Sequence, residues 1–232
     1  MSIKLTDTTL QYISWGAIAP VQNLALRTFC LRANINAYHA RTGWMFTLIP
    51  NSISDEWWSF GYRNSDDKIV LIVGWSTAAG VWTIAKPSTG VWHSFIISYN
   101  KGSTANNPVI YIDGISVTVT RATAPSGTYR SGTGSYWEVG ADDGTNVLDG
   151  YVEDLRYYNV IKSAAQASVI ASENIHTSAT IDESGLVFHA PLTMCKGLTY
   201  PTFAGSVLGA ANTFFDRING YLGVPSGSPV GA

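Results

Sequence analysis

Residues 109–119 read VIYIDGISVTV, with the Asp-Gly pair at 113–114 between two runs of β-branched and aromatic residues. An Asp-Gly pair closes a two-residue β-hairpin well, because both positions require a positive φ that Asp tolerates and Gly adopts freely. The alternation after the turn predicts that Ile115, Val117 and Val119 face a core. This stretch therefore predicts antiparallel β structure.

The same pattern recurs on both sides of this hairpin. Short runs rich in Val, Ile, Thr, Trp and Tyr are separated by Gly, Asn, Asp and Ser clusters, as in strands joined by turns. The expected strands span residues 26–35, 44–49, 56–63, 68–75, 81–85, 92–99, 109–112, 115–120, 136–140, 151–158 and 186–190. One open sheet of so many strands would leave apolar faces uncovered. We therefore predict an all-β, two-sheet antiparallel jelly-roll β-sandwich.

Two segments depart from the strand pattern. Residues 163–173 carry the one helical pattern, with Ser163 as N-cap, and we expect a short helix that covers a sandwich edge. After Cys195 the composition shifts to Gly, Ala, Pro and Ser without alternation. We expect a β-sandwich domain over residues 1–195 and an irregular tail over residues 196–232.

The tail contains aromatic residues spaced along this Gly- and Pro-rich backbone. They are Tyr200, Phe203, Phe214, Phe215 and Tyr221. Exposed aromatic side chains are costly, so we expect the tail either to lie across its own domain or to dock on a protein partner.

Composition and charge narrow the classes of protein. The 232 residues are 46% hydrophobic and 13% charged, which suits one large folded core. The net charge is -2 and Lys and Arg are scattered singly, so we expect neither nucleic-acid binding nor membrane binding. Residues 1–11 lack the pattern of a secretory signal, and no apolar stretch approaches a membrane span. We expect a chain that is kept in the cytoplasm or carried outside by another route.

The two cysteines lie far apart in the sequence, at Cys30 and Cys195. Neither a CxxC pair nor Cys/His spacing occurs, so zinc sites and thioredoxin-like redox sites are not expected. Each cysteine is expected to be a small buried hydrophobic residue, and a disulfide between them is the alternative.

Three segments occur in a fixed order: GVWHSFIISY at residues 90–99, VIYIDG at residues 109–114, and WEVGA at residues 137–141 followed by LDGYVEDLRYYN at residues 148–159. Together they resemble the laminin-G-like, pentraxin-like branch of the concanavalin A-like lectins and glucanases. The resemblance implies a lectin-like sandwich over roughly residues 25–190. Glu153 stands where that family usually has Asp.

These recurring residues have physical reasons that involve no function. Trp92 and Tyr157 are expected to fill the sandwich core, and Gly140 and Gly150 to relieve crowding between strands. The motif therefore specifies a fold that hosts lectins, hydrolases, lyases and structural modules alike.

The arrangement of the acidic residues argues against glycoside hydrolysis. The related glucanases carry a Glu-x-Asp-x-x-Glu pattern, which this chain lacks, and catalysis requires two carboxylates that face one cleft. The acidic pairs at residues 55–56, 66–67, 153–154 and 182–183 are adjacent, so in extended chain their side chains point to opposite faces. We expect no enzyme.

The histidines give the same indication. No nucleophile elbow or triad spacing is present, and His93 beside Trp92 is expected to pack at the end of a strand. A polysaccharide-degrading enzyme remains the alternative, for example a lyase, if Arg63, His93 and Tyr99 converge on one face.

The loop at residues 140–149 gathers hard oxygen donors at Asp142, Asp143, Asn146 and Asp149. Calcium prefers such ligands. In pentraxin-like relatives, acidic residues after the corresponding glycine help to bind calcium, so the resemblance implies a role for Asp142 and Asp143. The alternative is an Asx-rich turn without metal, and no other cofactor is expected.

Sugar binding needs an aromatic face that is turned away from the core. Strand alternation makes Trp58, Phe60 and Tyr62 the core series. It leaves Trp57, with Arg63 on the same face, as the candidate glycan platform.

We therefore expect a non-catalytic binding or structural module. Our first hypothesis is a virion protein, such as a phage decoration, fibre or adhesion protein, that assembles with other protein subunits and binds cell-surface glycans. A calcium-dependent lectin and a polysaccharide-degrading enzyme on the same fold are the alternatives.

Overall fold

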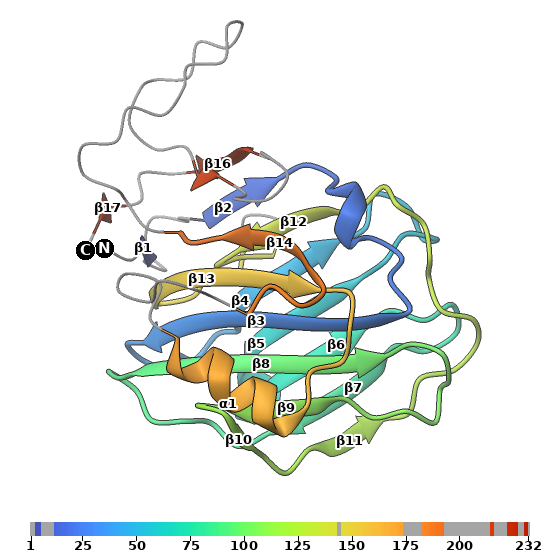
Figure 1. Ribbon diagram of the computed structural model, residues 1–232, viewed down its shortest axis with the longest axis horizontal. Helices are drawn as coiled ribbons and strands as arrows, with labels where there is room; N and C mark the ends of the chain where they lie inside the picture. The colour runs from blue at the N-terminus through green and yellow to red at the C-terminus, as the bar shows by residue number, and fades with distance from the viewer. Residues whose placement is uncertain are drawn as a thin grey trace, which may run out of the picture.

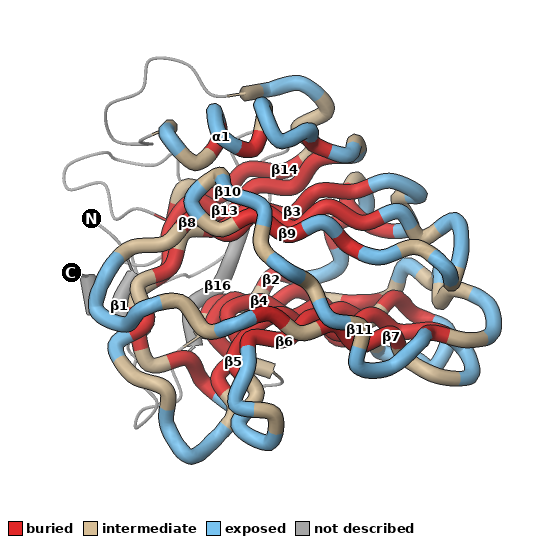
Figure 2. Tube along the Cα trace, turned by 90° about the horizontal axis from the view of Figure 1, so that it is seen from below, coloured by how far each residue is buried: buried red, intermediate tan, exposed pale blue. Residues whose placement is uncertain are grey.

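The computed structural model describes residues 12–142, 145–173 and 182–192, and the backbone of residues 3–5, 214–215, 222–226 and 230–231. Two antiparallel sheets pack face to face (Figure 1). Buried residues concentrate where the sheets meet, and the loops around them are exposed (Figure 2). The two-sheet β-sandwich predicted from the sequence is confirmed. No helix among the described residues is long and apolar enough to span a membrane.

Sheet A has the strand order β10-β9-β8-β3-β13-β1-β17, with β14 also paired to β13. Its strands are β1 (Ile3–Leu5), β3 (Leu26–Ile35), β8 (Trp92–Asn100), β9 (Val109–Ile112), β10 (Ile115–Ser116), β13 (Gly150–Tyr158), β14 (Leu186–Ala190) and β17 (Val230–Gly231).

Sheet B has the order β11-β7-β6-β5-β4-β12-β2-β16-β15. Its strands are β2 (Tyr12–Trp15), β4 (Gly43–Ile49), β5 (Trp58–Arg63), β6 (Lys68–Val73), β7 (Gly80–Ile84), β11 (Thr120–Thr123), β12 (Tyr136–Val139), β15 (Phe214–Phe215) and β16 (Leu222–Ser226). Short 3-10 turns occur at η1 (Ala19–Val21) and η2 (Asn64–Asp66).

The tail, expected to be irregular, contributes backbone pairing to both sheets. Strand β16 pairs with β2, and β17 pairs with β1. Tyr200, Phe203 and Tyr221 lie outside the described residues, and Phe214 and Phe215 are described only as the backbone of β15.

The Asp-Gly hairpin forms between β9 and β10. Asp113 and Gly114 have φ values of 53° and 78°, and Ile112 pairs with Ile115 across the turn. The expectation that Ile115 faces the core is wrong, because its side chain is 72% exposed. Strand β10 is the sheet edge and ends after two residues, but Val117 and Val119 beyond it are partly buried and pack against the core as expected.

Aromatic side chains form a large part of the inter-sheet core. Trp58, Phe60 and Tyr62 are buried there as predicted, and Tyr157 is buried as well. The expectation for Trp92 is wrong, since it is only partly buried and lies on the outer face of sheet A. The inward positions of β8 are taken by residues such as Phe95.

Strand β13 carries one extra residue. Glu153 pairs with Arg32 and Arg156 pairs with Cys30, so Asp154 and the residue after it lie opposite a single residue of β3. Asp154 takes the extra position with a φ of 57°. This β-bulge resets the alternation along the strand.

Helix α1 (Ala164–Ser172) begins with a capping box between Ser163 and Gln166, which confirms the predicted N-cap. It packs on the outer face of sheet A and not on the expected edge. There it buries Ala167 and Ile170 against an apolar cluster that includes Cys30. Cys30 is a free thiol, and burial raises its pKa well above the usual range. Cys195 lies outside the described residues.

A buried ionic network surrounds the bulge. The Arg156 guanidinium donates two hydrogen bonds to the Asp154 carboxylate, at 2.7 and 2.6 Å, and a third to Glu173 after α1. His189 on β14 contacts the same carboxylate at 3.0 Å. Burial disfavours the charged form of Asp154, but the hydrogen bonds from His189 and Arg156 hold its pKa below the ordinary value.

A second buried ion pair lies between the two sheets, near the start of β3. Arg27 on β3 donates to Glu56 at 2.7 Å and to the Tyr157 hydroxyl at 2.9 Å, and both charged side chains are fully buried. The Arg27 guanidinium lies 4.8 Å from the centre of the Trp58 ring. Arg27 thus bridges the two sheets, because it is on sheet A and Trp58 is on sheet B.

We predict that Arg27→Met lowers the free energy of unfolding by about 3–5 kcal/mol, because the buried Glu56 carboxylate loses its hydrogen-bonded partner and keeps only the more distant Lys101, at 3.8 Å. The double variant R27M/E56M removes both charges and is expected to recover most of that loss. Urea unfolding of the wild type, both single variants and the double variant gives the coupling energy. A double variant less stable than R27M would contradict a dominant role for the unpaired charge.

We predict a contribution of Asp154 to acid stability. Its folded pKa lies below its unfolded pKa, so its stabilisation is complete above about pH 4 and is lost as the pH falls through the folded value. Asp154→Asn should therefore be less stable at pH 7 and should lose less stability on acidification. Glu183→Gln, at an exposed carboxylate, is the control. Equal acid dependence of D154N and wild type in urea unfolding would refute this role.

Candidate functional site

The outer face of sheet A changes character along its strands. Beside α1, the row formed by β8, β3 and β13 is apolar or buried polar. The next row carries Ser94, Arg32 and Glu153, and the last row before the strand ends carries Trp92, Asn34 and Tyr151. These rows arise because every second residue of a strand points to the same face.

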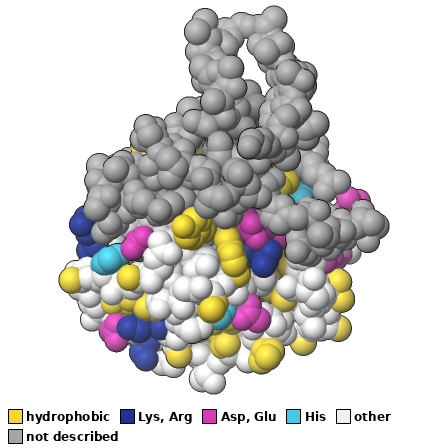
Figure 3. All heavy atoms as spheres, turned by 90° about the vertical axis from the view of Figure 1, so that its left-hand side faces the viewer, with side chains coloured by type: hydrophobic (Ala, Val, Ile, Leu, Met, Phe, Trp, Pro, Cys, Tyr) yellow, Lys and Arg dark blue, Asp and Glu magenta, His cyan; other side chains and the backbone are white. Residues whose placement is uncertain are grey.

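We call the five residues Arg32, Asn34, Trp92, Tyr151 and Glu153 the aromatic patch. The rings of Trp92 and Tyr151 flank Asn34, and their centres are 6.3 Å apart at an angle of 51°. Both rings are partly exposed. Figure 3 views the end of the molecule where β3 ends and β8 begins, and there hydrophobic side chains lie beside charged ones.

An ion pair borders the rings. Arg32 donates to Glu153 at 2.5 Å, and the Arg32 guanidinium lies 5.5 Å from the centre of the Trp92 ring. Glu153 is nearly buried, whereas Arg32 remains partly exposed. The family position that usually holds Asp therefore holds an acid long enough to reach across to β3.

One acceptor in the patch is unsatisfied. The Asn34 Oδ1 atom is buried and has no hydrogen-bond partner within the described part of the chain. A buried acceptor without a partner costs free energy that a donor from a bound molecule can offset. A hydroxyl that enters between the two rings would supply that donor.

Trp57 occupies the outer face of sheet B, as predicted. Its indole N–H donates to Ser59 at 3.0 Å, and its ring packs beside an apolar cluster that includes Trp44 and Val70. The Arg130 guanidinium lies 6.0 Å from the ring centre. Trp57 is therefore partly buried, and its polar atom is already bonded.

Arg63 does not join Trp57 in one compact site. Six strand positions separate them, which corresponds to roughly 20 Å. The Arg63 guanidinium donates to Asp66 in the neighbouring turn. A single sugar ring could not contact both residues.

The candidate calcium loop forms a tight turn. Asp142 and Thr145 exchange two backbone hydrogen bonds of 2.9 Å each. The Asp149 carboxylate is contacted by Asn36 at 2.9 Å and by His39 at 2.6 Å. Asn146 has a φ of 50°, whereas Asp143 lies outside the described residues.

Metal binding by this loop remains a prediction. No group of three or more Asp, Glu, His or Cys side chains in the described ranges is placed to hold a metal ion.

The three residues considered for a lyase do not converge. His93 and Tyr99 lie six positions apart on β8, roughly 20 Å along one strand. Tyr99 is in the inter-sheet core, and Arg63 belongs to sheet B and is bonded to Asp66. The geometry does not support a single site made of these side chains.

The aromatic patch was not predicted from the sequence, although the strand alternation of β8 contains a signal for it. Phe95, Ile97 and Tyr99 are the inward residues of β8. The same alternation places Trp92 on the other face, but its place in the family motif favoured the core instead. Tyr151 and Glu153 were hidden because the bulge shifts the alternation of β13.

Comparison with known proteins gives a family match. The model of the concanavalin A-like lectin/glucanases superfamily matches residues 7–168. No curated protein matches this chain in sequence.

Three solved structures share the fold at low sequence identity. A Bacteroides ovatus protein with an inferred carbohydrate-binding role is 14% identical, with a TM-score of 0.58 over 99% of this chain and 60% of that one. Tailspike protein 2 of an Escherichia coli O157:H7 bacteriophage is 13% identical, with a TM-score of 0.56 over 82% of this chain and 26% of that one. The heptameric pentraxin of Limulus polyphemus is 16% identical, with a TM-score of 0.52 over 80% and 90%.

These likenesses show the shared sandwich, and this chain spans only part of the first two proteins. The family match covers well over half of the chain and includes the hairpin and the bulged strand. The chain therefore belongs to the concanavalin A-like lectin/glucanases superfamily.

Proposed function

We propose that this protein is a glycan-binding module and that the aromatic patch is its binding surface. The observation that carries the proposal is the pair of partly exposed rings, Trp92 and Tyr151, on either side of the unsatisfied Asn34 acceptor. Sugar rings present C–H faces that stack on aromatic rings and hydroxyls that hydrogen-bond to amides and charged groups. The patch offers both kinds of partner within two rows of one sheet.

The Arg32–Glu153 ion pair suits a sugar that carries little or no charge. Arg32 and Glu153 neutralise each other, so the patch has no net charge that would select a strongly acidic or basic ligand. Arg32 nevertheless keeps exposed N–H groups that can donate to a hydroxyl. We therefore expect binding to depend only weakly on salt.

We further propose that the module binds its glycan without cleaving glycosidic bonds and is displayed on a larger assembly, such as a phage particle. Binding without cleavage fits the patch, where Glu153 is the one carboxylate and is engaged by Arg32. The shared sandwich of a phage tailspike and a heptameric pentraxin supports display with other subunits. Calcium binding at Asp142 and Asp143 is the second arm of the proposal.

We predict that Trp92→Ala and Tyr151→Ala each weaken glycan binding by roughly fivefold or more, because each ring contributes about 1 kcal/mol or more beyond simple burial. Glycan-array screening of the wild type identifies the ligand, and isothermal titration measures the variants. Trp57→Ala is the matched control on the other sheet. Binding lost in W57A but retained in W92A would move the site to sheet B.

The fold must survive these substitutions for the comparison to hold. Trp92 is partly exposed, whereas Trp137 is fully buried. Trp137→Ala is expected to cost about 3–5 kcal/mol of stability and W92A far less, as urea unfolding would show. Each binding measurement is repeated with calcium and with chelator. Equal glycan affinities under both conditions would contradict a role for calcium in binding.

Assembly is tested separately. Light scattering after size-exclusion chromatography of the full chain is expected to show a defined oligomer. A monomer would remove self-assembly and would leave display by another protein as the remaining form of the proposal.

A further inference from the structure

Ser88, His93 and Asp113 form a hydrogen-bonded chain that no motif in the sequence predicts. The Ser88 hydroxyl lies 3.1 Å from His93 Nε2, and His93 Nδ1 lies 2.7 Å from the Asp113 carboxylate. Ser88 comes from the loop between β7 and β8, His93 from the start of β8, and Asp113 from the β9–β10 turn. His93, expected to be a packing residue at the strand end, does pack against Phe95 and also links two polar partners.

The three residues have the roles of a nucleophile, a base and an orienting acid. An ionised carboxylate can only accept, so Nδ1 of His93 must donate to Asp113. In the neutral ring, Nε2 then carries the lone pair and can accept the Ser88 proton. These separations are those of a nucleophile and its general base.

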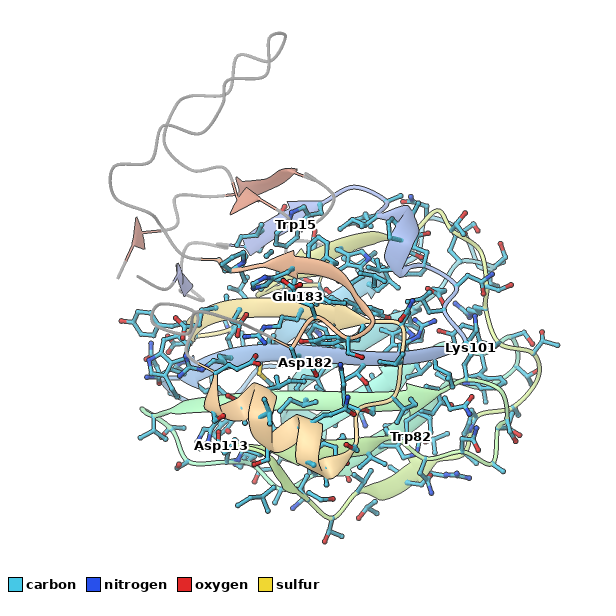
Figure 4. The ribbon with its side chains drawn as sticks, viewed as in Figure 1. Trp15, Trp82, Lys101, Asp113, Asp182 and Glu183 are labelled. Carbon is cyan, nitrogen blue, oxygen red and sulfur yellow. The ribbon has the colours of Figure 1, made fainter. Side chains whose placement is uncertain are left out.

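Asp113 is held rigidly in this arrangement. Its second carboxylate oxygen accepts from the Ser94 N–H at 2.8 Å, and its own N–H donates to the Ser94 carbonyl at 2.9 Å. Its positive φ is fixed by the hairpin. Figure 4 places Asp113 at the opposite end of the sheet from Lys101, so the triad is remote from the buried ion pair of Arg27 and Glu56.

The loop that carries Ser88 is also anchored. On one side, Lys86 contacts Asp67 at 2.5 Å, and the Tyr38 hydroxyl donates to the Pro87 carbonyl at 3.0 Å. On the other side, the Gly90 N–H donates to the Ile35 carbonyl at 2.8 Å. Ser88 is therefore an exposed hydroxyl on a fixed backbone.

Two backbone groups can stabilise charges that develop during acyl transfer, namely the negative charge on the substrate oxygen and the positive charge on His93. The Thr89 N–H follows the nucleophile directly and has no partner among the described residues. The residue after a catalytic serine supplies an oxyanion donor in many serine hydrolases. The Ser88 carbonyl oxygen lies 3.2 Å from His93 Nε2 and can accept a hydrogen bond from the Nε2–H when His93 holds the serine proton.

We propose that Ser88, His93 and Asp113 catalyse hydrolysis of carboxylic esters. Ser88 Oγ attacks the carbonyl carbon while its proton passes to His93 Nε2, and the ester C–O bond breaks as the alcohol takes that proton. Water then attacks the acyl-serine, His93 takes and returns a proton, and the acid leaves. Ester and water become acid and alcohol, and no other reactant is needed.

The exposed position of Ser88 indicates the class of natural ester. An acyl group that projects from a large molecule, such as an O-acylated glycan, can reach an exposed serine directly. This part rests on the proposed glycan binding, because the aromatic patch and the triad both lie at the start of β8, on opposite faces of the strand, so a glycan must extend around the strand end to reach Ser88. The acyl-transfer chemistry itself stands without it.

The test uses the purified full chain with p-nitrophenyl acetate and a fluorophosphonate probe. Wild type is expected to release p-nitrophenol and to gain one acyl or phosphonyl group at residue 88, located by peptide mass mapping. Ser88→Ala should abolish the labelling and lower the catalysed rate by roughly 100-fold or more. Asp113→Asn keeps the turn residue compatible with its φ and should lower both signals.

The controls separate a triad from simple imidazole catalysis. His39 is an exposed histidine that contacts Asp149 and has no serine partner among the residues described, so His39→Ala should leave the rate unchanged. Ser65→Ala removes an exposed hydroxyl that is bonded to Asp66 and should also have no effect. A rate in S88A equal to the wild-type rate, or labelling away from residue 88, would overturn the proposal.

The same variants distinguish this proposal from glycan binding. S88A should bind glycan as the wild type does, and W92A should keep its labelling at Ser88. If the wild type is labelled at Ser88 but binds no glycan, the esterase proposal holds and the glycan-binding proposal fails. If it binds glycan but is not labelled, glycan binding holds and the esterase proposal fails.

Discussion

The extra residue that β13 carries opposite Leu31 determines which side chains reach each face of sheet A. Before the bulge, Tyr151 and Glu153 point outward, and after it Arg156 and Tyr158 do. A regular strand would have kept odd-numbered residues outward and turned Tyr157 away from the core. Because of the bulge, β13 contributes side chains to the inter-sheet core, to the apolar cluster under α1 and to the aromatic patch.

The bulge costs free energy, through backbone strain and a buried charge at Asp154, and the surrounding residues offset that cost. Asp154 is a non-glycine residue with positive φ, and its carboxylate is buried. Arg156 and Glu173 bring charges from β13 itself and from the end of α1, and His189 on the neighbouring strand adds a hydrogen bond. A buried charge is tolerated where its hydrogen bonds are satisfied, and through Glu173 this network ties the end of α1 to the bulge.

Local features were predictable from the sequence, and non-local ones were not. The Asp-Gly turn and the Ser163 cap depend on residues within three positions, so their chemistry is visible in the order of the residues. The outward orientation of Trp92 was also predictable, because strand alternation from an inward Phe95 places Trp92 on the opposite face of β8. The bulge at Asp154 was not, because an adjacent acidic pair gives no sign of an extra residue. Ser88 and Asp113 meet His93 only through the folded loops and the pairing of β8 with β9.

The start of β8 shows how one strand end can hold two chemistries. Consecutive residues of a strand point to opposite faces, so Trp92 joins the aromatic patch while His93 faces the loop of Ser88 and the hairpin of Asp113. Neither residue has to move for the other to act. The interior of this sandwich is packed with aromatic and aliphatic side chains, so surface rows and strand ends are where such a fold can carry function. The alternation that builds the core thus also separates binding from chemistry.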